Sequence, residues 1–427
     1  MRERRGSDLT VRVRIGDHGS ECWVTRPGAE PIVVVGSLNI GRLAELRRNL
    51  SSDLDLFRSA LGNELDQREN WDRLTEAFRI LHRRGALLFI DLFGGPLAPM
   101  IATEFATILA AARKAKRYAV IDLNVPAPDC LPLEFLPVLN LRPPGRIKGK
   151  RDLEVTAASF LGFSAVVRRE FPPWQSGKGG PASQTGQVPV IENDPKLPLK
   201  LFHCAALPGA ASEADYFRTA NAHFELDGPW PAGRINPRSA VVKLARCMWN
   251  PWQPFRGKCR NRPDQIHHFA CHFKLDVQNT EVSFLQFQGP HSPPVEVHLG
   301  DLKYQLLATQ MGKKGPPSAF KPLVFANACQ TSTIQPGAAA SFPEVVLKNG
   351  NVGFIGTETA IPDKVACIFA QRFYENLLHG DTLGDSVMNA KHQLLLQYHN
   401  PLGILYVFYA EPDMRVRKPV PDLRREH

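Results

Sequence analysis

Short apolar runs alternate with amphipathic segments along most of this 427-residue chain, and this alternation limits the folds that it can adopt. Uninterrupted apolar runs at residues 31–36 and 86–93 have the length of buried strands, whereas residues 54–65, 71–81 and 101–116 carry apolar residues at helical spacing. Strands and helices that follow one another in this way usually build a parallel or mixed sheet with helices on both faces. The sequence therefore predicts an α/β fold.

A polar stretch divides this pattern into two halves. Residues 171–196 are rich in Gly, Pro, Ser and Gln, and they lack apolar periodicity until Val188, which indicates a flexible linker. We therefore expect an accessory α/β region over residues 1–170 and a second α/β domain over residues 197–427. In the first region the alternating residues 11–15 predict a hairpin at the edge of a sheet.

The alternation of strands and helices resumes after the polar stretch. Strands are expected at residues 199–205, 265–271, 282–287, 295–298, 323–327, 352–356 and 402–409. Helices are expected at residues 213–220, 239–247, 364–378 and 383–397. Because open α/β sheets bind ligands at the carboxyl ends of their strands, the polar residues that follow these strands are the first candidates for a functional site.

The composition argues against several classes of protein. No run approaches the roughly 20 apolar residues of a membrane helix, and the N-terminus lacks the apolar core of a secretory signal, so we expect a cytoplasmic protein without a membrane partner. The eight cysteines are scattered and include no CxxC pair, which indicates reduced thiols.

The net charge of +10 raises the question of a nucleic-acid partner. The basic clusters are dispersed, lack interleaved aromatic residues and match no nucleic-acid-binding motif, so direct binding of nucleic acid is not expected. A basic regulator associated with nucleic acid remains an alternative, and salt-dependent binding to DNA or RNA would reveal it.

Two expected strands end in residues that suit covalent catalysis. The segment QIHHFACHFKLD places His272 after a buried apolar run, and the segment PLVFANACQT does the same for Cys329. If the two strands are neighbours in a parallel sheet, the thiol and the imidazole can meet at one edge. An unperturbed thiol with a pKa of about 8.5 is only a few per cent thiolate at neutral pH, and an adjacent imidazolium that lowers the pKa by about 1.5 units would make roughly half of it reactive. A buried structural cysteine beside a core histidine would show the same pattern.

A cluster of possible ligands also raises the possibility of a structural zinc site: His267, His268, Cys271, His272 and Cys259. On a strand, His268 and His272 point to one face while His267 and Cys271 point to the other, so one tetrahedral site cannot easily use all of them. No glycine-rich phosphate-binding loop of the Walker or dinucleotide kind is present. We therefore expect neither a metal nor an organic cofactor.

Four ordered blocks carry a more specific signal: HFACH, NACQT, NGNVGFIGTETAIPDKVACIFAQRFYENLLHGDTLGDSV and NPLGILYVFYAEPDMRV. They resemble the CHAT family of caspase-like proteins, which is grouped with caspases, separases and gingipains. The resemblance covers about residues 265–415, with a weaker match at CLPLEFLPV, residues 130–138. It implies a caspase-like mixed, mostly parallel sheet with helices on both faces, preceded by an accessory or pseudo-caspase α/β half.

The resemblance also implies the catalytic residues. It places the catalytic histidine at His272 and the nucleophile at Cys329, with the backbone N–H groups of Phe273 and Cys329 as donors to the oxyanion. Many family members have glycine where this chain has Phe273, so a bulky side chain follows the catalytic histidine and could narrow or occlude the cleft. A further strand is expected beside the strand that precedes the nucleophile. In related peptidases, an acidic residue in the region after that further strand can bind a basic side chain of the substrate.

Three residues of this chain are candidates for that substrate pocket. Glu358 and Asp363 lie in the acidic segment GTETAIPD, and Gln330 directly follows the expected nucleophile. An equally good interpretation makes Asp363 the N-cap of the helix that begins beside it, because an aspartate there accepts a bond from a free backbone N–H.

The expected function is that of a cysteine endopeptidase that cleaves a protein substrate with a Cys/His dyad. The resemblance further implies control by an activating or sensor protein in a bacterial stress or anti-phage (antiviral) defence pathway, and residues 171–196 are a plausible site of self-cleavage. The alternative is a catalytically silent caspase-like scaffold or signalling module.

Overall fold

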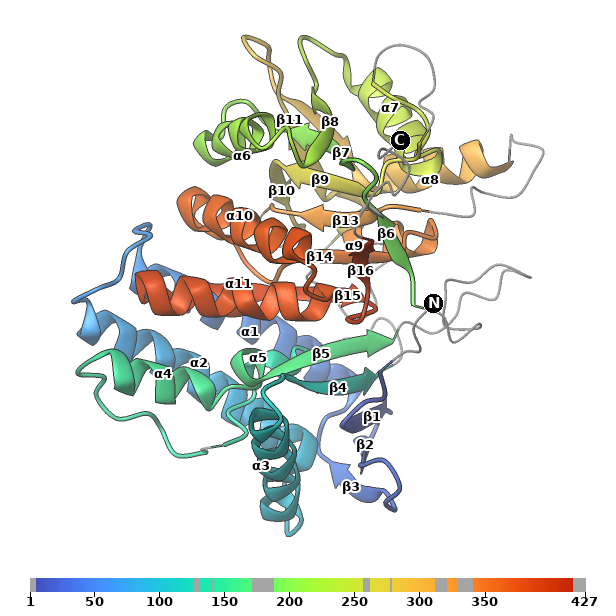
Figure 1. Cartoon of the computed structure of the whole chain (residues 1–427). Coiled ribbons are helices and arrows are strands. Elements are labelled where there is room, and N and C mark those ends of the chain that lie inside the picture. Colours follow the sequence, from blue (N-terminus) through green and yellow to red (C-terminus); the bar gives the residue numbers. More distant parts are fainter. Residues whose placement is uncertain are drawn as a thin grey trace, which may run out of the picture.

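Two β-sheets organise the computed structural model, which describes residues 5–125, 131–139, 141–170, 188–255, 262–276, 279–311, 321–328 and 341–417. A five-stranded sheet of order β3-β2-β1-β4-β5 belongs to the N-terminal half, and a six-stranded sheet of order β15-β14-β13-β9-β7-β8 belongs to the C-terminal half. Strand β15 of the six-stranded sheet lies beside β5 of the five-stranded sheet, and helices α10 (Asp363–His379) and α11 (Leu383–Tyr398) lie near this junction (Figure 1). The prediction of an α/β fold is confirmed.

The N-terminal sheet combines a hairpin with two parallel strands. Its strands are β1 (Leu9–Ile15), β2 (Ser20–Thr25), β3 (Ile32–Gly36), β4 (Ala119–Asn124) and β5 (Ala165–Glu170). The predicted hairpin forms between β1 and β2, but β3 takes the edge, and β1 pairs in parallel with β4 inside the sheet. The strand predicted at residues 31–36 forms as β3, but the prediction that it is buried is wrong, because Val33 and Val35 are 47% and 75% exposed on the edge.

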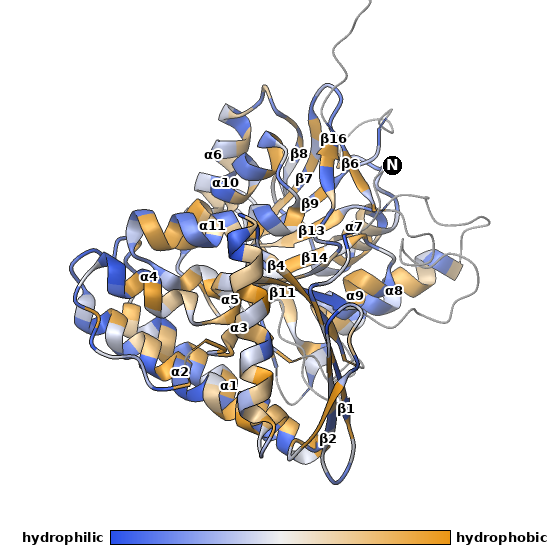
Figure 2. Cartoon of the chain, turned by 60° about the horizontal axis from the view of Figure 1, so that its bottom comes forward, coloured by the Kyte–Doolittle hydropathy of each residue, from blue (hydrophilic) through white to orange (hydrophobic). Residues whose placement is uncertain are grey.

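The apolar periodicity predicted three helices of this half, α1, α2 and α3, whereas α4 and α5 were not predicted. The helices are α1 (Ile40–Leu61), α2 (Trp71–Phe93), α3 (Ala98–Lys114), α4 (Lys150–Ala158) and α5 (Leu161–Ser164). The predicted strand at residues 86–93 is wrong, because these residues form the last turns of α2. Leu88 and Leu92 are buried while Leu87 and Ile90 are exposed, which is a helical period that so short an apolar run conceals. Figure 2 shows hydrophobic and hydrophilic residues alternating along α1 and α2.

The C-terminal sheet is mostly parallel, as predicted. Its strands are β7 (Leu197–His203), β8 (Phe224–Trp230), β9 (Ile266–Ala270), β13 (Leu323–Ala326), β14 (Gly353–Thr357) and β15 (Tyr406–Ala410). All neighbours pair in parallel except β14 and β15, which are antiparallel. Strand β9 lies directly beside β13, with His268 opposite Phe325. The carboxyl ends of these two strands therefore meet at one edge of the sheet.

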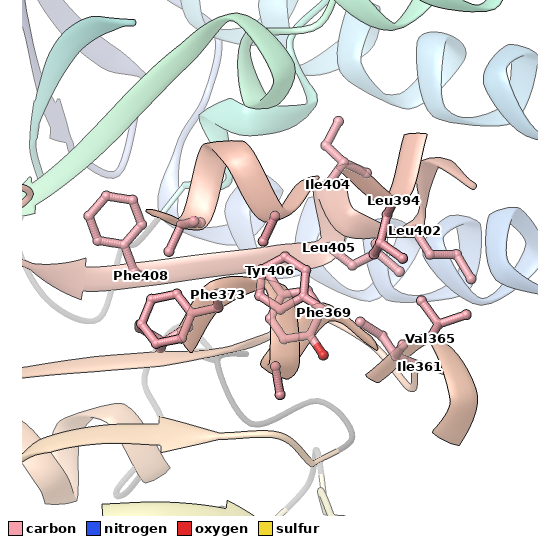
Figure 3. Packing of buried hydrophobic residues seen from close by; sticks show 14 of the residues in the cluster. Ile361, Val365, Phe369, Phe373, Leu394, Leu402, Ile404, Leu405, Tyr406 and Phe408 are labelled. Carbon is pink, nitrogen blue, oxygen red and sulfur yellow. The ribbon is translucent and has the colours of Figure 1, made fainter. Parts of the chain in front are cut away.

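Helices cover both faces of this sheet. One face carries α6 (Pro208–Thr219), α10 (Asp363–His379) and α11 (Leu383–Tyr398), and the other carries α7 (Pro237–Trp249), α8 (Leu299–Met311) and α9 (Phe342–Lys348). On the first face the ring of Phe369 stacks on Tyr406 with centroids 3.5 Å apart, beside Ile361 and Val365 (Figure 3). Helix α8 was not predicted.

A small antiparallel sheet extends the second face. It contains β10 (His272–Lys274), β11 (Phe284–Phe287) and β12 (Val295–His298). A further pair joins β6 (Val190–Glu192) to β16 (Arg415–Arg417) in parallel. The predicted linker therefore contains a strand in its last part, while residues 171–187 lie outside the described residues.

One hydrophobic cluster crosses from the N-terminal half to the C-terminal half. It joins Phe57 and Phe78 of α1 and α2 to Leu394 of α11 and to Leu402 in the 3-10 helix η4 (Pro401–Leu405). The division into domains at residues 1–170 and 197–427 stays a prediction, because the two halves share this core.

Within the described residues, no single helix is long and apolar enough to cross a membrane. Helices α2 and α3 meet the length and composition criteria only when they are taken together, and they are bent by 114° relative to each other.

Candidate functional site

A small pocket of about 60 Å³ lies at the carboxyl edge of the six-stranded sheet. The ends of β9 and β13 contribute Ala270, His272 and Ala328, and the first turns of α6 and α10 contribute Gly209 and Asp363. This is the edge where parallel α/β sheets bind their ligands. The sequence-based expectation that the two strand ends come together is confirmed.

His272 is exposed at the rim of this pocket. Strand β9 ends at Ala270, and the chain turns at Cys271 before His272 begins β10. The neighbouring residues alternate in exposure, so that Cys271 and Phe273 are buried while His272 is exposed, and both Cys271 and His272 line the pocket. An imidazole in this position can exchange protons with a bound molecule and with water.

Phe273 points away from the pocket. Its side chain is 6% exposed, and its ring stacks on Phe342 of α9 with centroids 6.2 Å apart. It belongs to the hydrophobic cluster beneath α7, α8 and α9, and it is not among the described residues that line the pocket. Strand alternation thus sends the bulky side chain into the core, so that it does not narrow the pocket in this structure.

Cys329 and Gln330, the predicted nucleophile and its neighbour, lie outside the described residues. Ala328, which precedes Cys329 in the sequence, lines the pocket. Its carbonyl oxygen accepts a hydrogen bond of 2.8 Å from Oγ1 of Thr357, another pocket residue at the end of β14. The described structure therefore brings the chain to the pocket directly before Cys329.

The side chain of Asn327 holds the carboxyl end of β13 in place through hydrogen bonds, a role that the sequence did not reveal. Its Nδ2 donates to Oε1 of Glu213 at 2.6 Å and to the carbonyl oxygen of Ala366 at 3.0 Å, while its Oδ1 accepts from the hydroxyl of Tyr406 at 2.5 Å. An asparagine in an otherwise apolar strand was the available signal, since a buried amide requires several partners.

Glu213 of α6 extends this network to the centre of the sheet. Its other carboxylate oxygen bonds Nε2 of His268, whose Nδ1 lies 3.0 Å from the hydroxyl of Tyr374. Glu213, His268 and Tyr374 are all buried. Burial raises the pKa of Tyr374 well above its ordinary value, so this hydroxyl stays protonated. A connected and buried network of this kind holds the pocket floor in one geometry.

Asp363 lines the pocket and ties two helices together. It is the first residue of α10, yet its carboxylate makes no capping bond to that helix and accepts instead from the backbone N–H of Gly209 in α6, at 3.4 Å. The interpretation of Asp363 as the N-cap of its own helix is therefore wrong. A Cβ atom at position 209 would lie 2.8 Å from Cβ of Asp363, so the close contact between the first turns of α6 and α10 requires glycine at this position.

Glu358 is not among the described residues that line the pocket. Its side chain is 3% exposed and lies 3.4 Å from the guanidinium of Arg47 in α1. Burial raises the pKa of the Glu358 carboxyl above its ordinary value, although the positive charges of Arg47 and Arg169 act to lower it. The residue points to the N-terminal half, so its placement gives no support to the prediction that it receives a substrate side chain.

The two histidines before the strand end face opposite sides of the sheet, as predicted. His268 lies in the network of Glu213, whereas the ring of His267 packs against Phe202 and its Nε2 lies 3.8 Å from Asp264. Cys259 lies outside the described residues. Among the residues that the structure describes, no group of three or more His, Cys, Asp or Glu side chains could hold a metal ion.

Two of the most similar solved structures are those of the separase–securin complex of Saccharomyces cerevisiae, determined at 3.0 and 2.6 Å. They are 10% identical to this chain, with TM-scores of 0.45 and 0.47, and the match covers 95% and 96% of this chain but 30% of each separase chain. At these scores the likeness carries no further conclusion.

Comparison with known proteins relates the sequence to one family. A probable protease of Vitiosangium sp. (strain GDMCC 1.1324) is 31% identical over 157 residues, which are 35% of this chain and 19% of that protein, so the chain spans about a fifth of its relative's length. The family model described as the CHAT domain matches residues 182–412, more than half of the chain, and this range contains every strand of the six-stranded sheet. The chain therefore belongs to the CHAT-domain family of caspase-like proteins.

Proposed function

We propose that this chain is a cysteine endopeptidase in which Cys329 is the nucleophile and His272 is the general base. The observation that carries the proposal is the pocket at the ends of β9 and β13. His272 lines it from one strand end, and Ala328, the residue before Cys329, lines it from the adjacent parallel strand. The reaction is cleavage of a peptide bond in a protein substrate.

The proposed mechanism proceeds through an acyl-enzyme. Cys329 gives its proton to His272, and the thiolate forms a C–S bond with the carbonyl carbon of the substrate. The backbone N–H groups of Phe273 and Cys329 stabilise the oxyanion, and the C–N bond breaks as the imidazolium of His272 protonates the leaving amine. His272 then takes a proton from water, whose oxygen displaces the thiolate and releases the carboxylate product. These steps require neither a metal nor an organic cofactor.

The experiment that tests this proposal is labelling with an irreversible, thiol-directed peptide probe, carried out with and without candidate partner proteins. We expect wild-type protein to be labelled at Cys329, as located by peptide mass spectrometry, and a Cys329→Ala variant to lose the label. Equal labelling of both proteins would falsify the assignment of the nucleophile.

Asp363 supports a preference for a basic residue on the amino side of the cleaved bond. Its carboxylate lies in the pocket wall among the apolar side chains of Leu207 and Ile361, which can pack against the methylene groups of a lysine or arginine. The long bond to Gly209 leaves the carboxylate able to accept a stronger, charge-assisted hydrogen bond. Gln330 could line the same pocket.

An Asp363→Asn variant should therefore lose about 10- to 100-fold in kcat/KM for substrates with a basic residue at this position, because a hydrogen bond to a charged group contributes about 1.5–3 kcal/mol. Profiling with a peptide library measures this change. The matched control is Asp215→Asn, in which an exposed carboxylate of α6 is neutralised and the profile should not change. An unaltered preference in Asp363→Asn would exclude this residue as the recognition group.

We further propose that a partner protein or signal controls the activity, in the cytoplasm and within a bacterial stress or anti-phage defence programme. The family membership and the harm that an unregulated endopeptidase would cause support this proposal. Self-cleavage within residues 171–196 is a candidate activation step. Mass spectrometry after activation tests it, and an uncut chain in a fully active sample would exclude it.

A further inference from the structure

Three consecutive residues at the end of β14 connect the pocket to the N-terminal half of the molecule. They are Thr357, Glu358 and Thr359, which are buried with exposed fractions of 1%, 4% and 0%. Thr357 lines the pocket, while the next two side chains reach α1. This segment is a short path between the pocket and a helix far away in the sequence.

At the pocket end, Thr357 holds the strand that leads to the proposed nucleophile. The bond from its Oγ1 to the carbonyl oxygen of Ala328 fixes the backbone of the residue that precedes Cys329 in the sequence. Asn327 is held from the other direction by Glu213 and Tyr406. A displacement of Thr357 would therefore displace Ala328, the residue that precedes Cys329 in the sequence.

At the other end, α1 holds the two following residues. The guanidinium of Arg47 lies 3.4 Å from the carboxylate of Glu358, and both side chains are almost fully buried. The hydroxyl of Thr359 donates to the carboxylate of Asp55. Arg47 and Asp55 are separated by little more than two helical turns, so they present their side chains to the segment from one side of α1.

We infer that Arg47 and Asp55 of α1 are positioning residues for the proposed nucleophile, acting through the segment from Thr357 to Thr359. The inference rests on the proposed function, and it gives the N-terminal half a direct part in catalysis. A chain of buried, hydrogen-bonded residues has little freedom to absorb a displacement, so a shift of α1 moves the segment as a whole. Misplacement of a reacting atom by about 1 Å can cost about 100-fold in rate.

The test compares isosteric variants that each remove one hydrogen bond between the halves. Thr359→Val removes the donor to Asp55 and keeps the side-chain shape, whereas Thr359→Ser keeps the donor. The matched control is Tyr118→Phe, which removes the bond of 2.9 Å from the Tyr118 hydroxyl to Asn389 of α11, a contact between the same halves that does not involve the segment. For each protein, kcat and KM are measured with a cleavable peptide, and alkylation of Cys329 by iodoacetamide is followed by mass spectrometry.

We expect Thr359→Val to lower kcat by 10- to 100-fold with KM changed less than twofold, while Thr359→Ser and Tyr118→Phe stay within twofold of wild type. A kcat equal to that of wild type in Thr359→Val, or an equal fall in Thr359→Val and Tyr118→Phe, would overturn the inference. A wild-type protein without turnover or selective alkylation of Cys329 would instead overturn the proposed function. If Thr359→Val does not fold, the pair Asp55→Ala and Asp55→Asn applies the same comparison, since asparagine keeps an acceptor for Thr359.

Discussion

Replacement of His272 by alanine should lower kcat/KM for a cleavable peptide by about 1,000-fold, since general acid–base catalysis contributes about 10²–10⁴-fold. Two losses combine in this variant. In the proposed mechanism the thiol of Cys329 loses the imidazole that would hold it as a thiolate, and the leaving amine loses its proton donor. The exposed position of His272 at the pocket rim means that the substitution leaves the core intact.

The pH dependence of thiol alkylation separates these two losses. The alkylation of Cys329 should reach half of its maximal rate at a lower pH in wild type than in His272→Ala, where the thiol should titrate near the value for an unperturbed cysteine, about 8.5. The matched control is His379→Ala, which removes an exposed histidine at the far end of α10. Identical alkylation profiles in wild type and His272→Ala would remove His272 from the mechanism.

The largest effect on stability is expected from Lys200→Met. Lys200 is fully buried in β7, and its Nζ lies 2.5 Å from Oδ2 of Asp264, 3.5 Å from Oδ2 of Asp227 and 2.6 Å from the carbonyl oxygen of Gln253. Methionine matches the volume but leaves two carboxylates without their cation. Removal of one partner from a buried ion pair costs about 3–5 kcal/mol, so the free energy of unfolding should fall by that amount at pH 7. Urea unfolding measures it.

The pH dependence of this loss has a defined sign. Although burial raises the pKa of Asp264, the nearby side chain of His267, 3.8 Å away, and the charge of Lys200 outweigh burial and hold that pKa below its ordinary value. Without Lys200 the carboxyl should titrate above its value in the unfolded chain, so the penalty is present above the new pKa and is relieved as the pH falls through it. The loss should therefore be smaller at pH 5 than at pH 7, and Asp264→Asn should restore part of the stability of Lys200→Met. A loss below about 1 kcal/mol at both pH values would contradict this account of the buried cation.

The sequence predicted the helices and strands well wherever apolar runs were bounded by turn residues. Strands β9 and β13 are examples. Because neighbouring parallel strands end at the same edge of a sheet, His272 and Cys329, which follow these two strands in the sequence, were expected at one edge. Helix α8 was not predicted because its large side chains are not confined to one face. Tyr304 and Met311 are 73% and 86% exposed, so the apolar residues of this segment do not show a clear helical period. Residues 86–93 were misassigned because the period of a short apolar run cannot distinguish a strand from a buried helix.

The blocks around His272 and Cys329 were enough to predict the candidate reactive residues and the strand ends that carry them. The side chains from distant parts of the chain that support these strand ends became visible only in the folded structure. Glu213 reaches Asn327 from another helix, and Arg47 reaches Glu358 across 311 positions of the chain. The physical reason is that local periodicity places a residue on one face of its own element, whereas the identity of the element packed against that face depends on how the whole core closes.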